Sequence, residues 1–72
     1  MKSYLNLSGD SGITHYEIGD DYIEVWFGLA KLYRYSYASA GQQHVECMKS
    51  LAIAGRGLAT YINRHVKESY DR

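Results

Sequence analysis

Three tyrosines occupy every second position of one short stretch, at Tyr33, Tyr35 and Tyr37. Side chains at every second position of a strand share a face, so this spacing predicts a strand with one tyrosine face. If that face is exposed, Tyr33 and Tyr35 can stack unpaired RNA bases, while Arg34 adds charge on the opposite face. If it is buried, the rings are core and their hydroxyls reach the sheet edge. We favour the buried interpretation, because a sheet needs one buried face.

Basic residues near the C-terminus form a second candidate site. Gly55-Arg56-Gly57 precedes an expected helix, whose free backbone N–H groups and dipole favour an anion. Arg56, Arg64 and Lys67 would assist in binding it. The alternative is an ordinary turn between helices that needs glycine for its geometry. We favour the turn, because the full spacing of a phosphate-binding loop is missing.

His44 and Cys47 stand three residues apart on an expected helix, a spacing that suits a metal pair or a Cys–His nucleophile. No third ligand or orienting group has matching spacing, although His15 and His65 could come near. We therefore expect Cys47 to be a buried cysteine on an amphipathic helix, with no metal and no cofactor. Without a convergent acid, base or nucleophile, and with no small-molecule substrate evident, the chain is predicted not to be an enzyme.

Composition limits the classes of function. The 72 residues suffice for one domain with a thin core, and eight acidic residues balance eight basic ones. That balance argues against a general nucleic-acid or membrane-surface binder. Residues 1–30 are net acidic and residues 49–72 net basic, so the two halves either attract each other or leave a basic end for an anionic partner. A single cysteine and the lack of an apolar run of ~20 residues predict a cytoplasmic location without a membrane span.

Alternating apolar residues predict strands over residues 13–18, 22–27 and 31–37, joined by turns at 19–21 and 28–30. These strands form an antiparallel meander. In the second strand the inward face comprises Ile23, Val25 and Phe27. In the first strand Ile13 is expected to share a face with His15 and Glu17.

Two helices should follow the meander. Ser39 and Gln42 have the spacing of a capping box, Gly55 suits a helix end, and Val45, Met48 and Ala52 form an apolar face. The stripe of the second helix comprises Leu58, Tyr61, Ile62, His65 and Val66, and residues 67–72 are expected to fray. The predicted fold is α+β, a three-stranded antiparallel β-meander followed by two helices packed on one face, over residues 13–70. Residues 1–12 are expected to be a flexible lead-in, part of which Tyr4, Leu5 and Leu7 could pin to the body.

Trp26 is expected on the sheet face that the helices leave open, with Glu24 and Arg34. An exposed Trp beside an Arg could stack a base or a partner's side chain. Alternatively, Tyr4 or Leu5 of the N-terminal segment covers it, or a dimer partner does.

The order of several short patterns resembles the KTSC family, small domains found alone in bacteria and phages and also at the C-terminus of some lysyl-tRNA synthetases. The similarity spans roughly residues 12–70 and rests on order and spacing. It comprises residues 23–27, the central Tyr33 and Tyr35, and the segment Gly57, Tyr61, Ile62, Asn63 and Val66. The resemblance implies a role in RNA binding and no enzymatic activity. Asn63 either makes a structural hydrogen bond or contacts a ligand.

Two functions are consistent with these patterns. One is a small binding domain for RNA, or for a tRNA-associated protein, that uses Tyr33, Arg34, Tyr35, Arg56, Arg64 and Lys67. The other is a protein-interaction or self-associating module, including a homodimer, that uses the open sheet face around Trp26 or an unpaired strand edge.

Overall fold

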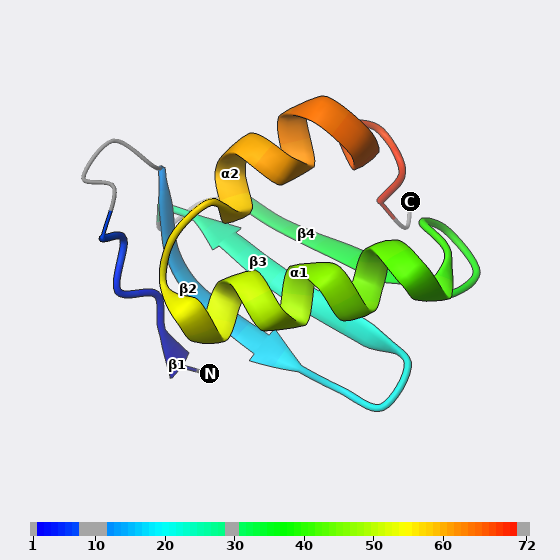
Figure 1. The fold of residues 1–72 in the computed structure, drawn as a ribbon, viewed down its shortest axis with the longest axis horizontal. Helices are drawn as coiled ribbons and strands as arrows, with labels where there is room; N and C mark the ends of the chain where they lie inside the picture. Colours follow the sequence, from blue (N-terminus) through cyan, green and yellow to red (C-terminus); the bar gives the residue numbers. More distant parts are fainter. Residues whose placement is uncertain (1, 8–11, 29–30, 71–72) are drawn as a thin grey trace.

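A four-stranded antiparallel sheet carries two helices on one face in the computed structural model, which describes residues 2–7, 12–28 and 31–70 (Figure 1). The sheet order follows the chain: β1 (Lys2–Ser3), β2 (Ile13–Ile18), β3 (Tyr22–Phe27) and β4 (Lys31–Ser36). The helices are α1 (Gln42–Ala54) and α2 (Leu58–Tyr61), and α2 continues as the π-helical turn η1 (Ile62–Val66). The predicted α+β class is confirmed. No helix in the described ranges is long and apolar enough to cross a membrane.

The sheet has one strand more than predicted. β1 pairs with β2, Lys2 opposite Tyr16 and Ser3 opposite His15. Two residues are too few to show an alternating pattern, so β1 gives no sequence signal. Tyr4 follows it into the core and its hydroxyl accepts a hydrogen bond from the Leu58 N–H at 3.3 Å. Within the expected lead-in, Met1 and residues 8–11 lie outside the described residues, as do residues 29–30 of the second expected turn.

The sheet face toward the helices is the one that periodicity predicts. Ile23 and Val25 of β3 are fully buried there, and Tyr35 of β4, directly opposite Ile23, is 1% exposed. Phe27 packs against the edge of this core and is half-buried. The buried interpretation of the tyrosine face therefore holds for Tyr35, whereas Tyr33 is only half-buried.

The face predicted for Ile13 is wrong. The pairing of β2 with β3 shifts between Ile13 and His15, so that Ile13 lies opposite Phe27 and is 2% exposed. Such a bulge inserts one residue and moves everything before it to the other face. Thr14 is the extra residue, and its hydroxyl donates to the Gly28 carbonyl at 3.2 Å. A strict alternation of side chains cannot reveal this shift.

Helix α1 begins without the predicted capping box. Gly41 is its N-cap and no side chain bonds to the free N–H groups of its first turn. The Ser39 hydroxyl instead accepts a hydrogen bond from the Ser36 N–H at 3.0 Å, which closes the turn after β4. The predicted apolar face of α1 is confirmed, since Val45, Met48 and Ala52 are buried.

Helix α1 ends at Gly55, as predicted. Gly55 has a φ of 81°, a left-handed conformation that glycine adopts without a steric penalty. The next helical segment buries Leu58, Ile62 and Val66, the inner half of the predicted stripe. Its change to a π-helical turn at Ile62 was not predicted. Single π-helical turns often occur at functional sites, so the residues around η1 are candidates for such a site.

Candidate functional site

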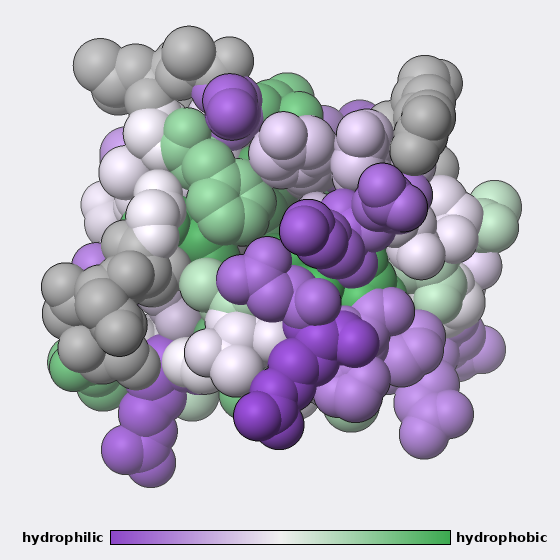
Figure 2. Space-filling model, turned by 90° about the horizontal axis from the view of Figure 1, so that it is seen from above, coloured by the Kyte–Doolittle hydropathy of each residue, from purple (hydrophilic) through white to green (hydrophobic). Residues whose placement is uncertain are grey.

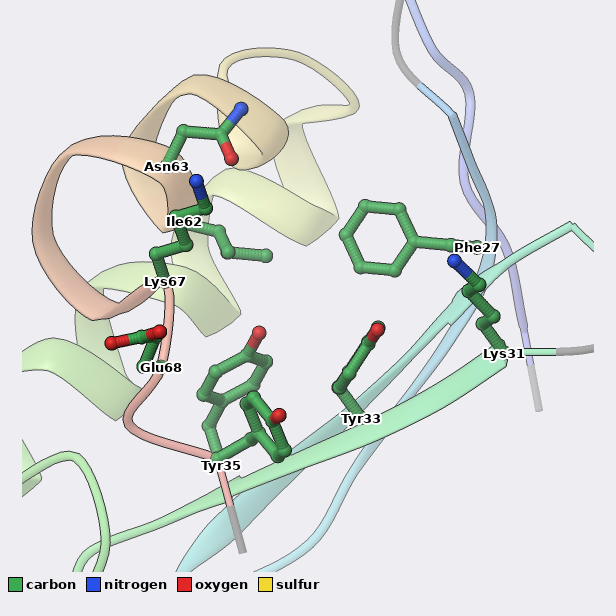
Figure 3. Close-up of a pocket in the computed structure, with 9 residues that line it drawn as sticks. Phe27, Lys31, Tyr33, Tyr35, Ile62, Asn63, Lys67 and Glu68 are labelled. Carbon is green, nitrogen blue, oxygen red and sulfur yellow. The ribbon is translucent and has the colours of Figure 1, made fainter.

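A hollow of about 380 Å³ lies between the sheet and the C-terminal helical segment (Figure 3). We call it the Tyr33 pocket. It is lined by Phe27, Lys31, Tyr33, Tyr35, Ile62, Asn63, Lys67, Glu68 and Tyr70. Phe27 and the β4 residues supply the sheet side, and η1 with the residues after it supplies the opposite side. Seen from the side on which α2 lies in Figure 1, apolar surface is recessed between polar side chains (Figure 2).

Aromatic rings form one continuous wall of this pocket. The Tyr33 ring meets Phe27 with centroids 5.6 Å apart and Tyr70 with centroids 4.8 Å apart, both edge to face. Tyr70 also meets Tyr35 edge to face, at 6.4 Å. The hydroxyls of Tyr33 and Tyr35 point toward the space between Phe27 and Ile62 (Figure 3).

Burial raises the pKa of Tyr35 to about 12, and the neighbouring hydroxyls of Tyr33 and Tyr70 add to that shift. Tyr35 therefore keeps its proton at neutral pH. Its hydroxyl can donate or accept a hydrogen bond in the pocket, but it supplies neither a negative charge nor a strong base.

Two ammonium groups stand on opposite sides of the hollow. Lys31 rises from the start of β4 beside Phe27, and Lys67 follows η1 beside Ile62 (Figure 3). Asn63 and Glu68 complete the polar rim. Within residues 2–7, 12–28 and 31–70, no hydrogen bond or ion pair engages the side chains of these four residues. They are available to a ligand that offers both negative charge and hydrogen-bonding groups.

The structure brings together only some of the residues predicted from the sequence. Tyr33, Tyr35 and Lys67 line the Tyr33 pocket. Arg56 is exposed in the turn between α1 and α2, and Arg64 is exposed on η1, and neither lines the pocket.

Arg34 lies on the opposite sheet face, as its position in the strand predicts. Its guanidinium donates to the Glu24 carboxylate at 2.9 and 3.1 Å and lies 4.4 Å from the centre of the Tyr22 ring. Arg34 therefore belongs to a separate surface from Tyr33 and Tyr35.

The sequence analysis did not identify five of the pocket residues as site residues: Phe27, Lys31, Ile62, Glu68 and Tyr70. Lys31 carried a usable signal, because it precedes Tyr33 and Tyr35 in the same period of two. Tyr70 carried none, since the tail was expected to fray, whereas its ring packs on two strand residues.

Trp26 lies on the open face, half-buried, between its cross-strand neighbours His15 and Leu32. Cover by Tyr4 or Leu5 is wrong. Tyr4 is in the core under α2, and the Leu5 side chain lies against Gly55 at the end of α1. The Leu32 side chain, next to Trp26, is 49% exposed.

His44 contacts two side chains of the next helical segment. The His44 ring nitrogen Nδ1 lies 2.6 Å from the Tyr61 hydroxyl, and the His65 ring stacks on His44 with centroids 5.8 Å apart. Cys47 is exposed, not buried as predicted. In the part of the chain that the structure describes, no three His, Cys, Asp or Glu side chains are grouped so that they could hold a metal ion.

No protein-family model, curated protein or solved structure matches this chain. The resemblance to the KTSC family therefore stays a prediction from the sequence. The Tyr33 pocket and the open sheet face are the two surfaces of the described structure that suit a ligand or a partner.

Proposed function

We propose that the chain is a small non-enzymatic domain that binds single-stranded RNA, with one nucleotide seated in the Tyr33 pocket. The observation that carries this proposal is the position of Lys31 and Lys67 on opposite sides of a hollow with an aromatic wall. Proteins that bind single strands combine cations for the phosphates with rings for the bases, and each stacked base contributes about 1–3 kcal/mol.

The pocket changes how the tyrosines would be used. Tyr35 is core, so a flat platform of tyrosine rings is not available. An unpaired base would instead enter the hollow between Phe27 and Ile62, and meet the hydroxyls of Tyr33 and Tyr35 at its floor. Lys67 would then hold a phosphate of that nucleotide, and Lys31, on the opposite side of the hollow, would meet its acceptor groups.

Binding fits the pocket better than catalysis does. Its described lining contains neither His nor Cys, and the raised pKa of Tyr35 keeps that hydroxyl protonated at neutral pH. These groups can hold a ligand by charge, stacking and hydrogen bonds, with Glu68 as the carboxylate that accepts hydrogen bonds.

The remaining basic residues would contact the strand beyond the pocket. Arg56 is exposed in the turn before α2, and Arg64 is exposed on η1, next to Asn63. They would neutralise further phosphates without reading any base. The resemblance to the KTSC family supports the same ligand class, because relatives of that kind occur beside a tRNA-binding enzyme.

The proposal is tested by fluorescence anisotropy of a labelled single-stranded RNA oligomer. Lys31→Gln and Lys67→Gln should each weaken binding. Lys67→Gln should also reduce the slope of log affinity against log salt concentration by about one phosphate contact. Lys2→Gln, on β1, removes the same charge away from the pocket. It should leave both the affinity and its salt dependence nearly unchanged. If all three variants bind like the wild type, RNA is not held at this pocket.

A second candidate function is self-association through the open sheet face. Leu32 is 49% exposed beside Trp26, and the same face carries both signs of charge on Glu24 and Arg34. A two-fold interface between identical copies is self-complementary, and a patch with both signs of charge is compatible with that. Sedimentation velocity over a range of concentrations tests it: a dimer that Leu32→Arg abolishes supports this function, and a monomer at every concentration excludes it.

A further inference from the structure

We propose that the Tyr33 pocket selects guanine among the four RNA bases. This inference rests on the proposed function, since it names the base that the RNA-binding pocket takes. It starts from Glu68, a carboxylate that lines a pocket otherwise suited to an anionic ligand.

A carboxylate repels phosphate, so it is compatible with an RNA ligand only if the base offers it hydrogen-bond donors. An ionised carboxylate has two oxygens, both acceptors. Guanine carries two adjacent donors, N1–H and N2–H₂, which match such a pair of oxygens. Adenine and cytosine carry one exocyclic amino group each, and uracil has a single N3–H between two carbonyl oxygens that a carboxylate would repel.

The ammonium groups select the same base from its other edge. Guanine N7 and O6 are adjacent acceptors, and an arginine or lysine bound to this pair is the commonest base-specific contact in protein–DNA recognition. Lys31 and Lys67 flank the hollow from opposite sides, whereas Glu68 follows Lys67 on one side only. A guanine in the hollow can therefore present its donors to Glu68 and its acceptors to Lys31, with Lys67 left for the phosphate.

The shape of the pocket suits a flat ring system. Phe27 and Ile62 face each other across the hollow (Figure 3). A volume of about 380 Å³ falls at the small end of the range for small-molecule sites, about 300–1,000 Å³, which fits one nucleotide. The Asn63 amide, with donors and an acceptor, can meet the ribose 2′-hydroxyl, which is both donor and acceptor.

Amide shift titrations with GMP, AMP, CMP and UMP test the selection directly. GMP should shift the amides of residues 31–35 and 62–70. It should bind roughly tenfold or more tightly than the other three nucleotides, which is the discrimination that one good bidentate contact provides. Two RNA pentamers, uridine throughout except for a central guanosine or adenosine, show whether the same preference holds within a strand. A preference for GMP alone, without binding of either pentamer, would assign the pocket to a free guanine nucleotide and contradict the RNA function.

A conservative variant isolates the role of Glu68. Glu68→Gln keeps the size of the side chain but turns one acceptor into a donor, so GMP affinity should fall roughly tenfold while AMP affinity stays the same or rises. Glu68 is exposed, so the variant should fold, which its amide spectrum checks. Asp20→Asn, an exposed charge change in the turn before β3, is the matched control and should leave both affinities unchanged.

The outcomes separate the two proposals. Equal binding of all four nucleotides at the pocket overturns the guanine selection and leaves RNA binding standing. Guanine preference that survives in Glu68→Gln also overturns the inference, because its cause then lies elsewhere. Absence of any nucleotide or RNA shift at residues 31–35 and 62–70 overturns the proposed function together with the selection.

Discussion

Tyr33 on β4 and Tyr70 near the end of the chain meet edge to face, with ring centroids 4.8 Å apart. The same Tyr70 ring contacts Tyr35, so the tail after η1 is held against the strand by two aromatic contacts. This relationship closes one side of the Tyr33 pocket and places Lys67 and Glu68 opposite Lys31. The pocket therefore depends on a tail that has no regular secondary structure of its own.

Removal of the Tyr70 ring should destabilise the domain and loosen the pocket. Tyr70→Ala should lower the free energy of unfolding by about 1–3 kcal/mol, because each edge-to-face pair contributes about 0.5–1.5 kcal/mol beyond its buried area. Tyr70→Phe keeps both ring contacts and should retain most of that stability. Urea unfolding measures both variants, and an unchanged midpoint for Tyr70→Ala would mean that the tail does not pack on Tyr33.

Ionisation of Tyr35 should lower the free energy of unfolding at alkaline pH. Its pKa is raised to about 12 in the folded state, while the unfolded value is about 10. Between these values the unfolded state binds fewer protons than the folded one, so the free energy of unfolding falls as pH rises. The contribution is fully present below pH ~10 and is lost toward pH ~12, for a total of about 2–3 kcal/mol.

Tyr35→Phe isolates this effect, because the other tyrosines titrate in both proteins. Urea unfolding of the two proteins at pH ~8 and pH ~11.5 should show a larger loss of stability in the wild type. Equal losses would mean that the Tyr35 hydroxyl ionises as readily in the folded protein as in the unfolded chain.

A methyl group added at Gly55 should destabilise the domain, because it would clash with Leu5 of the N-terminal segment. A Cβ at Gly55 would lie 2.7 Å from the Leu5 Cβ, and the residue has a φ of 81°. Gly57 has the same φ of 81°, but its Cβ would meet only Leu51 Cδ2, at 3.6 Å. Left-handed backbone strain costs roughly 1–2 kcal/mol in both variants, so Gly55→Ala should destabilise more than Gly57→Ala.

Thermal unfolding of the two glycine variants measures that difference. Leu5→Gly removes the clashing atom, so in its background the excess cost of Gly55→Ala should disappear. A persistent excess would show that Leu5 does not pack on Gly55 and that the segment after β1 is placed differently.

Periodicity predicted the parts of the fold where the local pattern and the global packing agree. Ile23, Val25 and Tyr35 alternate on the buried sheet face, and Val45, Met48 and Ala52 recur at helical spacing on α1. Both patterns follow directly from strand and helix geometry. The same rule failed at Ile13, because the bulge at Thr14 breaks the alternation by one residue.

The remaining features depend on contacts that no local pattern encodes. β1 forms because two residues find a partner in β2, and the Ser39 hydroxyl closes a turn where the capping-box spacing predicted a helix start. In the candidate site, Tyr33 and Lys67 were identified from residue type. Their meeting with Lys31 and Glu68 depends on how the tail crosses β4, which requires the tertiary fold.

A map of backbone amide shifts on RNA addition shows whether RNA binds at the Tyr33 pocket. Single-stranded RNA is titrated into isotope-labelled protein at low and at physiological salt. We expect saturable shifts, weaker at higher salt, at residues 31–35 and 62–70, with smaller shifts at Arg56. Shifts confined to Trp26 and its neighbours on the open sheet face, or no shifts at any RNA concentration, would contradict it.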